Sequence, residues 1–324
     1  MTGSPGSKER GAVRTISALV VATGLVISLA ACSSTPAEQL AACSPAVASG
    51  SVSDLVSTTG TGSAEPTVAF PTPLVAKSTQ RTIETTGDGE ILTDGDIAEI
   101  QLTQVNGADA AVIGSSYASG SQLYPVGGED FIAEILACTP VGSRIIATVP
   151  VSEFAETTDK AATAVFVIDV LDGFDGKADG TPQLGQNGLP SIVTAPDGTP
   201  GYTFTGGDAP EKLRTEVLQK GDGAEVAEGD KIVIQFTGVT WTDETKLTST
   251  WDSRPLRTNA SAEDTIDNES SLYFPGTAKL ELVGQTVGSQ LIIAVPAAFG
   301  FEGGGGIAEG ETVVYVVDIL AIQK

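Results

Sequence analysis

A phrase that occurs twice in this chain constrains its fold more than any other feature. The later copy, Val217–Gly238, reads as a Gly-Asp-Gly turn, a second turn and then a strand. In that strand Ile232, Ile234 and Phe236 alternate with other side chains, the period expected when one sheet face is packed. The earlier copy, TTGDGEILTDGDIAEIQLTQV, spans Thr85–Val105 and matches the later one at a constant spacing.

The repeat continues towards the C-terminus. Further blocks recur in the same order, and in each pair the earlier copy comes first: Pro140–Ser143 and Thr286–Ser289, Ile145–Pro150 and Leu291–Pro296, Thr163–Leu171 and Thr312–Leu320. The spacing drifts only by changes in loop length. This pattern indicates a duplicated domain rather than a solenoid of many short repeats.

Length and composition agree with two β-rich domains. A chain of 324 residues favours two domains, and 38 Gly with 17 Pro separate short Val/Ile/Thr-rich runs. Helical periodicity is scarce: the segment after Glu129 is the best short-helix candidate, and its counterpart around Lys279 is shorter. We therefore expect an α+β fold that is mostly β.

The first 32 residues read as a secretory signal rather than as part of the fold. A basic stretch precedes an apolar run, Thr15–Ala31, and the cysteine Cys32 follows directly. That ending resembles the bacterial lipobox and predicts cleavage before Cys32 with a lipid on its thiol. The alternatives are an ordinary signal peptide or an uncleaved anchor, for which the apolar run is near the short limit.

Charge and composition exclude several kinds of function. The formal net charge is −24, whereas nucleic-acid binding depends on neutralising phosphates, so we expect no nucleic-acid partner. The acidic balance is typical of a solvated, self-repelling secreted surface. The chain contains no histidine, which excludes histidine general bases, histidine zinc sites and Ser-His-Asp triads. We expect no metal and no cofactor.

Two cysteines remain besides Cys32. Outside the cytoplasm, Cys43 and Cys138 favour a disulfide over a metal-binding pair. Such a bond would pin the mature N-terminus to the first domain. The expected organisation is a signal at 1–32, a tether at 33–49, a first domain at 50–171, a linker at 172–188 and a second domain at 189–324.

The second domain resembles the FKBP-type peptidyl-prolyl cis-trans isomerases, the macrolide-binding immunophilins. Five motifs carry the resemblance in family order: the strand Gly229–Gly238, the aromatic-Asp-Ser triplet Trp251–Ser253, Leu282–Gln290, Val295–Gly305 and the closing strand Val313–Leu320. The full layout, a lipobox followed by two such domains, resembles FKBP-type lipoproteins of Gram-positive actinobacteria. The resemblance implies tandem domains, each a twisted antiparallel sheet wrapped around one short helix.

The resemblance also implies a chemistry without nucleophiles. Rotation about an X-Pro amide has a barrier of about 18–20 kcal/mol, and uncatalysed exchange takes roughly tens to hundreds of seconds. An apolar, aromatic slot weakens amide conjugation and fits the twisted transition state. The expected role is isomerisation of exported polypeptides at the cell surface, with proline-containing chains and macrolides as partners and a lipid anchor in the membrane.

Carried over residue by residue, the family pocket falls on five catalytic candidates and four substrate-contacting candidates. The catalytic candidates are Phe236, Trp251, Asp252, Phe301 and Tyr315. The substrate-contacting candidates are Tyr273, Phe274, Leu282 and Val295. The insert from Arg254 to Ser271 leaves the register around Tyr273 open.

The sequence departs from the family pattern at several positions. The family's floor tryptophan is replaced by Ala278 in a gap-free alignment, or it is deleted, and Phe301 lacks the usual hydroxyl. In the first domain Leu102 replaces Phe236 and Val151–Phe154 replaces the flap, while Phe166 keeps its aromatic ring. We expect the first domain to keep the fold without the activity.

Each candidate also has a plain structural interpretation. Phe236, Trp251 and Tyr315 are, by default, core residues of a β-domain, and Asp252 is a turn residue. The alternative function is accordingly a non-catalytic FKBP-like binding or chaperone lipoprotein. A third interpretation is a structural envelope protein made of two β-domains.

Overall fold

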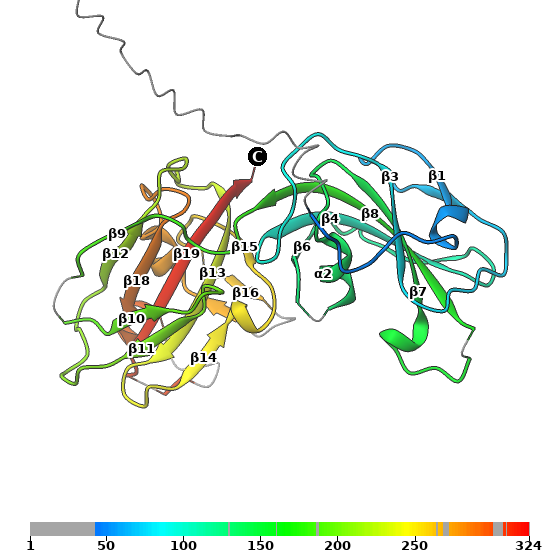
Figure 1. Cartoon of the computed structure of the whole chain (residues 1–324). Helices are drawn as coiled ribbons and strands as arrows, with labels where there is room; N and C mark the ends of the chain where they lie inside the picture. The colour runs from blue at the N-terminus through cyan, green and yellow to red at the C-terminus, as the bar shows by residue number, and fades with distance from the viewer. Residues whose placement is uncertain are drawn as a thin grey trace, which may run out of the picture. The chain divides into compact units, whose positions relative to one another are not determined.

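The computed structural model describes residues 43–323, except 129, 160, 186–187, 264, 268–271, 301–306 and 309, and it describes 265–267, 272–273 and 300 by their backbone only. The sequence expectations for the signal, for Cys32 and for most of the tether lie outside these residues. As predicted, the chain is mostly β with a few short helices (Figure 1). Among the described residues, no helix is long and apolar enough to cross a membrane.

The first half of the chain forms one antiparallel sheet. Its strands are β3 (Gln80–Thr85), β4 (Ile97–Asn106), β5 (Val112–Ser115), β6 (Gln122–Pro125), β7 (Arg144–Pro150) and β8 (Thr163–Phe174). The order is β3-β7-β8-β4-β5, and β6 pairs with the free part of β4. The long strands β4 and β8 therefore form the centre of this sheet.

The second half forms a sheet with the same order plus one strand. Its strands are β9 (Thr181–Pro182), β12 (Arg214–Lys220), β13 (Lys231–Thr240), β14 (Lys246–Ser249), β15 (Leu256–Asn259), β18 (Gln290–Val295) and β19 (Val313–Gln323). The order is β9-β12-β18-β19-β13-β14, with β15 paired to β13. The repeated sequence thus produces a repeated topology. Strands β12, β13, β14, β15, β18 and β19 take the places of β3, β4, β5, β6, β7 and β8.

Short elements complete the described chain. Three two-stranded pairs are β1 (Ser57–Thr59) with β2 (Thr67–Ala69), β10 (Ser191–Thr194) with β11 (Pro200–Thr203), and β16 (Thr265–Asp267) with β17 (Leu272–Phe274). The α-helices are α2 (Phe131–Leu136), α3 (Gly276–Leu280) and α4 (Ala297–Gly300), and the 3-10 helices are η1 (Ser53–Leu55), η2 (Val151–Glu153) and η3 (Thr250–Asp252). The helices expected after Glu129 and around Lys279 are α2 and α3.

The repeated Gly-Asp-Gly turns make the same contacts in both sheets. The amide of Gly87 donates to Ser143 Oγ at 2.9 Å, and the amide of Gly221 donates to Ser289 Oγ at 2.9 Å. A Cβ at either glycine would lie 2.1 Å from a backbone carbonyl oxygen, so no side chain fits there. The sequence identity at these positions therefore has a steric cause.

Helix α2 is held at both ends. Asp130 accepts from the amides of Ile132 and Ala133 and so satisfies donors at the start of the helix. At the other end the buried guanidinium of Arg81, from β3, donates to the carbonyls of Ile135, Ala137 and Cys138. Burial lowers the pKa of Arg81 to about 10.

A disulfide lies next to this helix end. Cys43 and Cys138, the pair named from the sequence, are joined with their Cα atoms 5.7 Å apart and 95 residues apart in sequence. The bond ties the start of the described chain to the second residue after α2. A closed loop of this length stabilises a fold by roughly 4–5 kcal/mol in the chain-entropy estimate.

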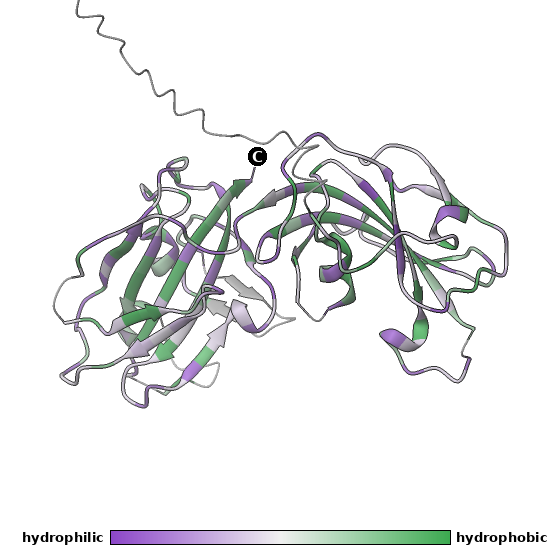
Figure 2. Ribbon diagram, viewed as in Figure 1, coloured by the Kyte–Doolittle hydropathy of each residue, from purple (hydrophilic) through white to green (hydrophobic). Residues whose placement is uncertain are grey.

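Each sheet packs one face against its own apolar core. The first core contains Ile132, Ile135 and Leu136 of α2, and the second contains Ala278 of α3. A separate cluster covers the opposite face of the second sheet, where Tyr202 of β11 packs near Ile292 and Val316. Figure 2 shows hydrophobic residues concentrated in the strands and more hydrophilic loops between them.

Candidate functional site

Three aromatic rings from three separate strands meet on the second sheet. Phe236 lies in β13, Phe274 in β17 and Tyr315 in β19. The ring centroids of Phe236 and Phe274 are 4.8 Å apart, those of Phe274 and Tyr315 5.2 Å, and those of Phe236 and Tyr315 6.0 Å. No ring is more than 1% exposed. We call these residues the buried ring cluster.

A glycine makes room for this cluster. Gly238 pairs with Tyr315 across β13 and β19, and a Cβ on Gly238 would lie 2.8 Å from Tyr315 Cε1. The Tyr315 ring therefore covers the glycine backbone. The glycine that closes the repeated phrase in this strand fixes where the ring can lie.

The substrate-contacting candidates fall into the same core. Phe274, Leu282 and Val295 are fully buried together with Phe236 and Tyr315. Ala278, the residue that a gap-free alignment places on the missing floor tryptophan, also lies there, on α3. Because the side chain of Ala278 is small and not aromatic, the aromatic surface of this core comes from the buried ring cluster.

The structure separates two other candidates from the ring cluster. Trp251 does not belong to this core: a Cβ built on Gly198, in the turn between β10 and β11, would lie 2.3 Å from Trp251 Cη2. Asp252 directs its carboxylate to Lys246 Nζ at 2.6 Å, and its side chain is 59% exposed. Phe301 lies outside the described residues, and Tyr273 is described by its backbone in β17 only.

Sequence reasoning missed a threonine that fixes η3 to the strand of Phe236. Thr250 Oγ1 accepts from the amide of Phe236 at 2.8 Å and donates to its carbonyl at 3.2 Å. In the first sheet Ser116 holds Leu102 in a similar way. Its hydroxyl accepts from the Leu102 amide and its own amide donates to the Leu102 carbonyl, both at 2.9 Å. The constant spacing between the two copies aligns Thr250 with Ser116, and this alignment could have identified the two hydroxyls from the sequence.

A buried acid lies in β19, opposite Gln290 of β18. Asp318 is 2% exposed and accepts from the amide of Ala178 and from Gln290 Nε2, both at 2.8 Å. Burial raises the pKa of Asp318 to about 6, although the two hydrogen bonds favour the carboxylate. The equivalent acid of the first sheet, Asp169, instead pairs with Arg144 at 2.7 Å.

The first sheet carries a second aromatic cluster that opens to solvent. Phe131 of α2, Phe154 after η2 and Phe166 of β8 have ring centroids 5.2–5.7 Å apart. Phe166 is buried, Phe131 is half-buried and Phe154 is 36% exposed. We call these residues the open ring cluster. Leu102, at the position of Phe236, packs beside it in the first core.

The chemistry available at both clusters is binding rather than covalent catalysis. The buried ring cluster offers apolar surface and the single hydroxyl of Tyr315, and the open ring cluster offers three phenyl rings. Within the part of the chain that the structure describes, no group of three or more His, Cys, Asp or Glu is arranged to hold a metal ion.

Comparison with known proteins identifies relatives of one kind. No family model matches the chain. An FK506-binding protein of Streptomyces anulatus is 28% identical over 126 residues, which span 38% of this chain and 96% of the relative. A probable FK506-binding protein of Corynebacterium glutamicum is 26% identical over 115 residues, 36% of this chain and 91% of the relative.

Solved structures of the same kind match more distantly. The three FKBP domains of wheat FKBP73 match with a TM-score of 0.30 and 14% identity, over 76% of this chain and 95% of that one. FkpA from Escherichia coli matches with a TM-score of 0.28 and 17% identity, over 41% of this chain and 51% of that one.

Proposed function

We propose, from the similarity of this chain to two FK506-binding proteins, that it is a peptidyl-prolyl cis-trans isomerase of exported polypeptides. The two sheets with the same strand order are then two tandem FKBP-like domains, each wrapped on its short helix. The second sheet carries the activity because it retains the five family motifs in order.

The observation that supports this function most is the convergence of Phe236, Phe274 and Tyr315 within 4.8–6.0 Å on one core. Twisting an X-Pro amide removes its conjugation, and an apolar environment disfavours the charge-separated planar form that water stabilises. A slot lined by these rings lowers the barrier by binding the twisted amide more tightly than the planar one.

The exposure of the rings sets a condition on this mechanism. Because each ring is at most 1% exposed, a prolyl ring reaches the cluster only when the side chains that cover it move aside. In this proposal Asp252, which is exposed at the end of η3 and paired with Lys246, contacts the substrate backbone outside the buried rings.

The burial of these three rings also favours an alternative, a non-catalytic FKBP-like binding or chaperone lipoprotein. A core in which Ala278 replaces the family's aromatic floor can stay packed permanently and serve as a scaffold. This protein would suppress aggregation of exported clients without accelerating prolyl exchange.

The place of action that we propose is the outer side of the cell membrane, through a lipid on Cys32. The signal-like N-terminus and the lipobox support it. The disulfide between Cys43 and Cys138 agrees with an oxidising compartment outside the cytoplasm. Macrolides, which bind the related family, are proposed ligands of the second sheet.

The test is prolyl exchange measured by NMR on a proline peptide, with the mature chain at catalytic concentration. We expect faster exchange with the wild type, slower exchange with Asp252→Ala, and wild-type exchange with Asp243→Ala, a control in an exposed turn. No enhancement by folded wild-type protein, combined with suppressed client aggregation, would establish the alternative.

A further inference from the structure

The open ring cluster has no place in the proposed isomerase mechanism. Phe131 and Phe154 stack with their ring planes 28° apart, and Phe154 meets the buried Phe166 edge-on at 73°. The three rings thus form a continuous aromatic path from the first core to the surface. An aromatic ring stacked on a second one and still in contact with water is a common anchor of protein contacts.

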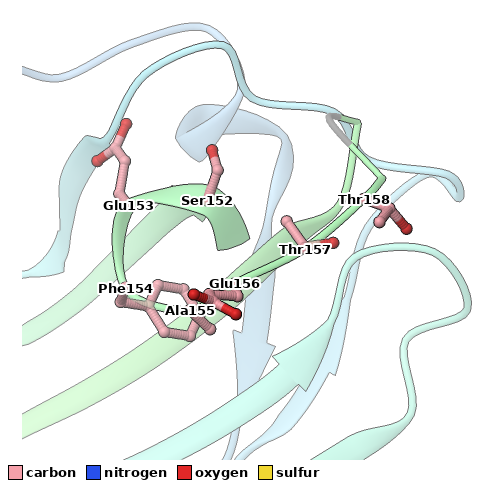
Figure 3. Close-up of a pocket in the computed structure, with 7 residues that line it drawn as sticks. All are labelled: Ser152, Glu153, Phe154, Ala155, Glu156, Thr157 and Thr158. Atoms are coloured by element: carbon pink, nitrogen blue, oxygen red, sulfur yellow. The ribbon is translucent and has the colours of Figure 1, made fainter.

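The loop that carries Phe154 lines a shallow cavity that is widely open to solvent. Its volume is about 1060 Å³, and its lining includes Phe154, Ala155, Glu153 and Glu156 (Figure 3). Glu153 accepts a hydrogen bond from Thr79, which ties this loop to the segment before β3. The cavity is large enough for several residues of an extended peptide.

The charged residues next to the rings in sequence are mostly acidic, and Lys160, which directly follows Asp159, lies outside the described residues. Asp130 precedes Phe131, and Glu153, Glu156 and Asp159 surround Phe154 in sequence. Neither of the described segments 130–136 and 151–159 contains a lysine or arginine. An apolar surface framed by carboxylates complements a ligand that is apolar and cationic, and it repels ligands that carry acidic residues.

We propose that the open ring cluster binds an extended polypeptide segment in which an apolar side chain lies next to a lysine or arginine. The apolar side chain packs on Phe154 and Phe131, and the cation pairs with Glu153 or Glu156 or lies over an aromatic face. A second copy of this chain is a poor occupant, since its net charge of −24 is repelled by the same carboxylates.

This binding site is separate from the proposed isomerase function. It lies on the other sheet, uses no residue of the buried ring cluster and needs no prolyl bond. A protein that lacks isomerase activity can still hold unfolded cationic segments here, and an active one can hold its client while the second sheet acts.

The test is fluorescence anisotropy of labelled peptides with the mature chain. One peptide places Phe between lysines, a second places Phe between glutamates, and a third replaces Phe by Ser between lysines. We expect saturable binding of the first peptide, at least about tenfold weaker binding of the other two, and weaker binding of the first at high salt.

Two variants locate the site. Phe154→Ala should weaken binding of the Lys-Phe peptide by about fivefold or more through loss of the exposed ring. The double variant Glu153→Gln with Glu156→Gln should weaken it at low salt only. Val193→Ala, which shortens a 70% exposed apolar residue on β10, is the matched control and should bind as the wild type does.

The outcomes are separable from those of the exchange assay. Phe154→Ala should keep its circular dichroism and should exchange a proline peptide at the wild-type rate. Equal affinity of Phe154→Ala and wild type, equal affinity for the Lys-Phe and Glu-Phe peptides, or no saturable binding would each overturn the proposal, whatever the isomerase result.

Discussion

Two equivalent buried acids show how single residues diverged after the duplication. Asp169 pairs with Arg144 across β7 and β8, with two hydrogen bonds of 2.7 and 2.9 Å. Asp318 faces Gln290 at the same register position of β18 and β19. Replacement of the cation by an amide leaves the second carboxylate buried without a full opposite charge, which is why its pKa rises.

Asp318 should therefore make stability depend on pH. Its pKa is about 6 in the folded chain against roughly 3.9 in an unfolded one, so the fold binds the proton more tightly. The free energy of unfolding from this group is highest below about pH 4, falls as the pH rises through 6 and stays low above it. Asp318→Asn has one acceptor where the carboxylate has two, so it loses a hydrogen bond at every pH, but it removes the buried charge. Its stability relative to wild type should therefore rise by roughly 2–3 kcal/mol between about pH 4 and pH 7.5, as measured by urea denaturation.

Asp169→Asn is the matched control, and it should act in the opposite direction. Removing this carboxylate leaves the buried Arg144 uncompensated, which costs roughly 3–5 kcal/mol at neutral pH. If the effect of Asp318→Asn on stability were the same at about pH 4 and pH 7.5, the account of Asp318 as a buried acid without a full opposite charge would be wrong.

Gly238 offers a second prediction at the scale of one residue. Gly238→Ala places a methyl group 2.8 Å from the Tyr315 ring, so it should destabilise the second sheet by about 1–3 kcal/mol and move that ring. Gly114→Ala on β5 meets nothing within 4 Å and should stay within about 0.5 kcal/mol of wild type. Urea denaturation compares the two, and equal costs would contradict the role of Gly238.

At the scale of elements, the sequence predicted the strands, because they follow from hydrophobic periodicity. It did not predict where a side chain in a short irregular element points. The alternation around Phe236 and the apolar run that ends the chain became β13 and β19 at the centre of one sheet. The motif order also brought Phe236 and Tyr315 together. Trp251 could not be placed in this way, because it lies in the short η3 and its ring turns towards the turn between β10 and β11.

Helix α2 illustrates an element whose support was invisible in the sequence. Six residues rarely form a stable helix alone, and the last carbonyls of α2 depend on a guanidinium from β3. Arg81 precedes its acceptors by more than fifty residues. No local pattern connects a strand arginine to a distant helix end.

Removing this guanidinium should loosen the end of the helix before it unfolds the sheet. Arg81→Met should lower the free energy of unfolding by roughly 2–4 kcal/mol, because several buried carbonyls lose their donor. Hydrogen exchange should accelerate most at the amides of α2. Arg81→Lys keeps the charge without the planar fork and should fall between wild type and Arg81→Met. Unchanged exchange in α2 would show that the contact is not supporting the helix.

At the scale of the whole molecule, each sheet is stabilised by a core of its own, and only the first core is covalently tied. The sequence suggested both the duplication and the cysteine pair, since each follows from spacing and residue type. It could not suggest which ring cluster opens to solvent, because exposure depends on where Phe131 and Phe154 lie in the folded loops.

The disulfide gives a test of how the two halves depend on each other. Because the loop between Cys43 and Cys138 encloses most of the first sheet, reduction should lower the stability of that sheet by up to about 4–5 kcal/mol and leave the amides of β13 and β19 protected. Hydrogen exchange with and without dithiothreitol measures both sheets at once. Cys43→Ser should reproduce the reduced protein and be insensitive to dithiothreitol, and this controls for side effects of the reductant. If protection fell equally in both sheets, the two cores would unfold as one cooperative unit, and an inactive first sheet would then be needed to keep the second one folded.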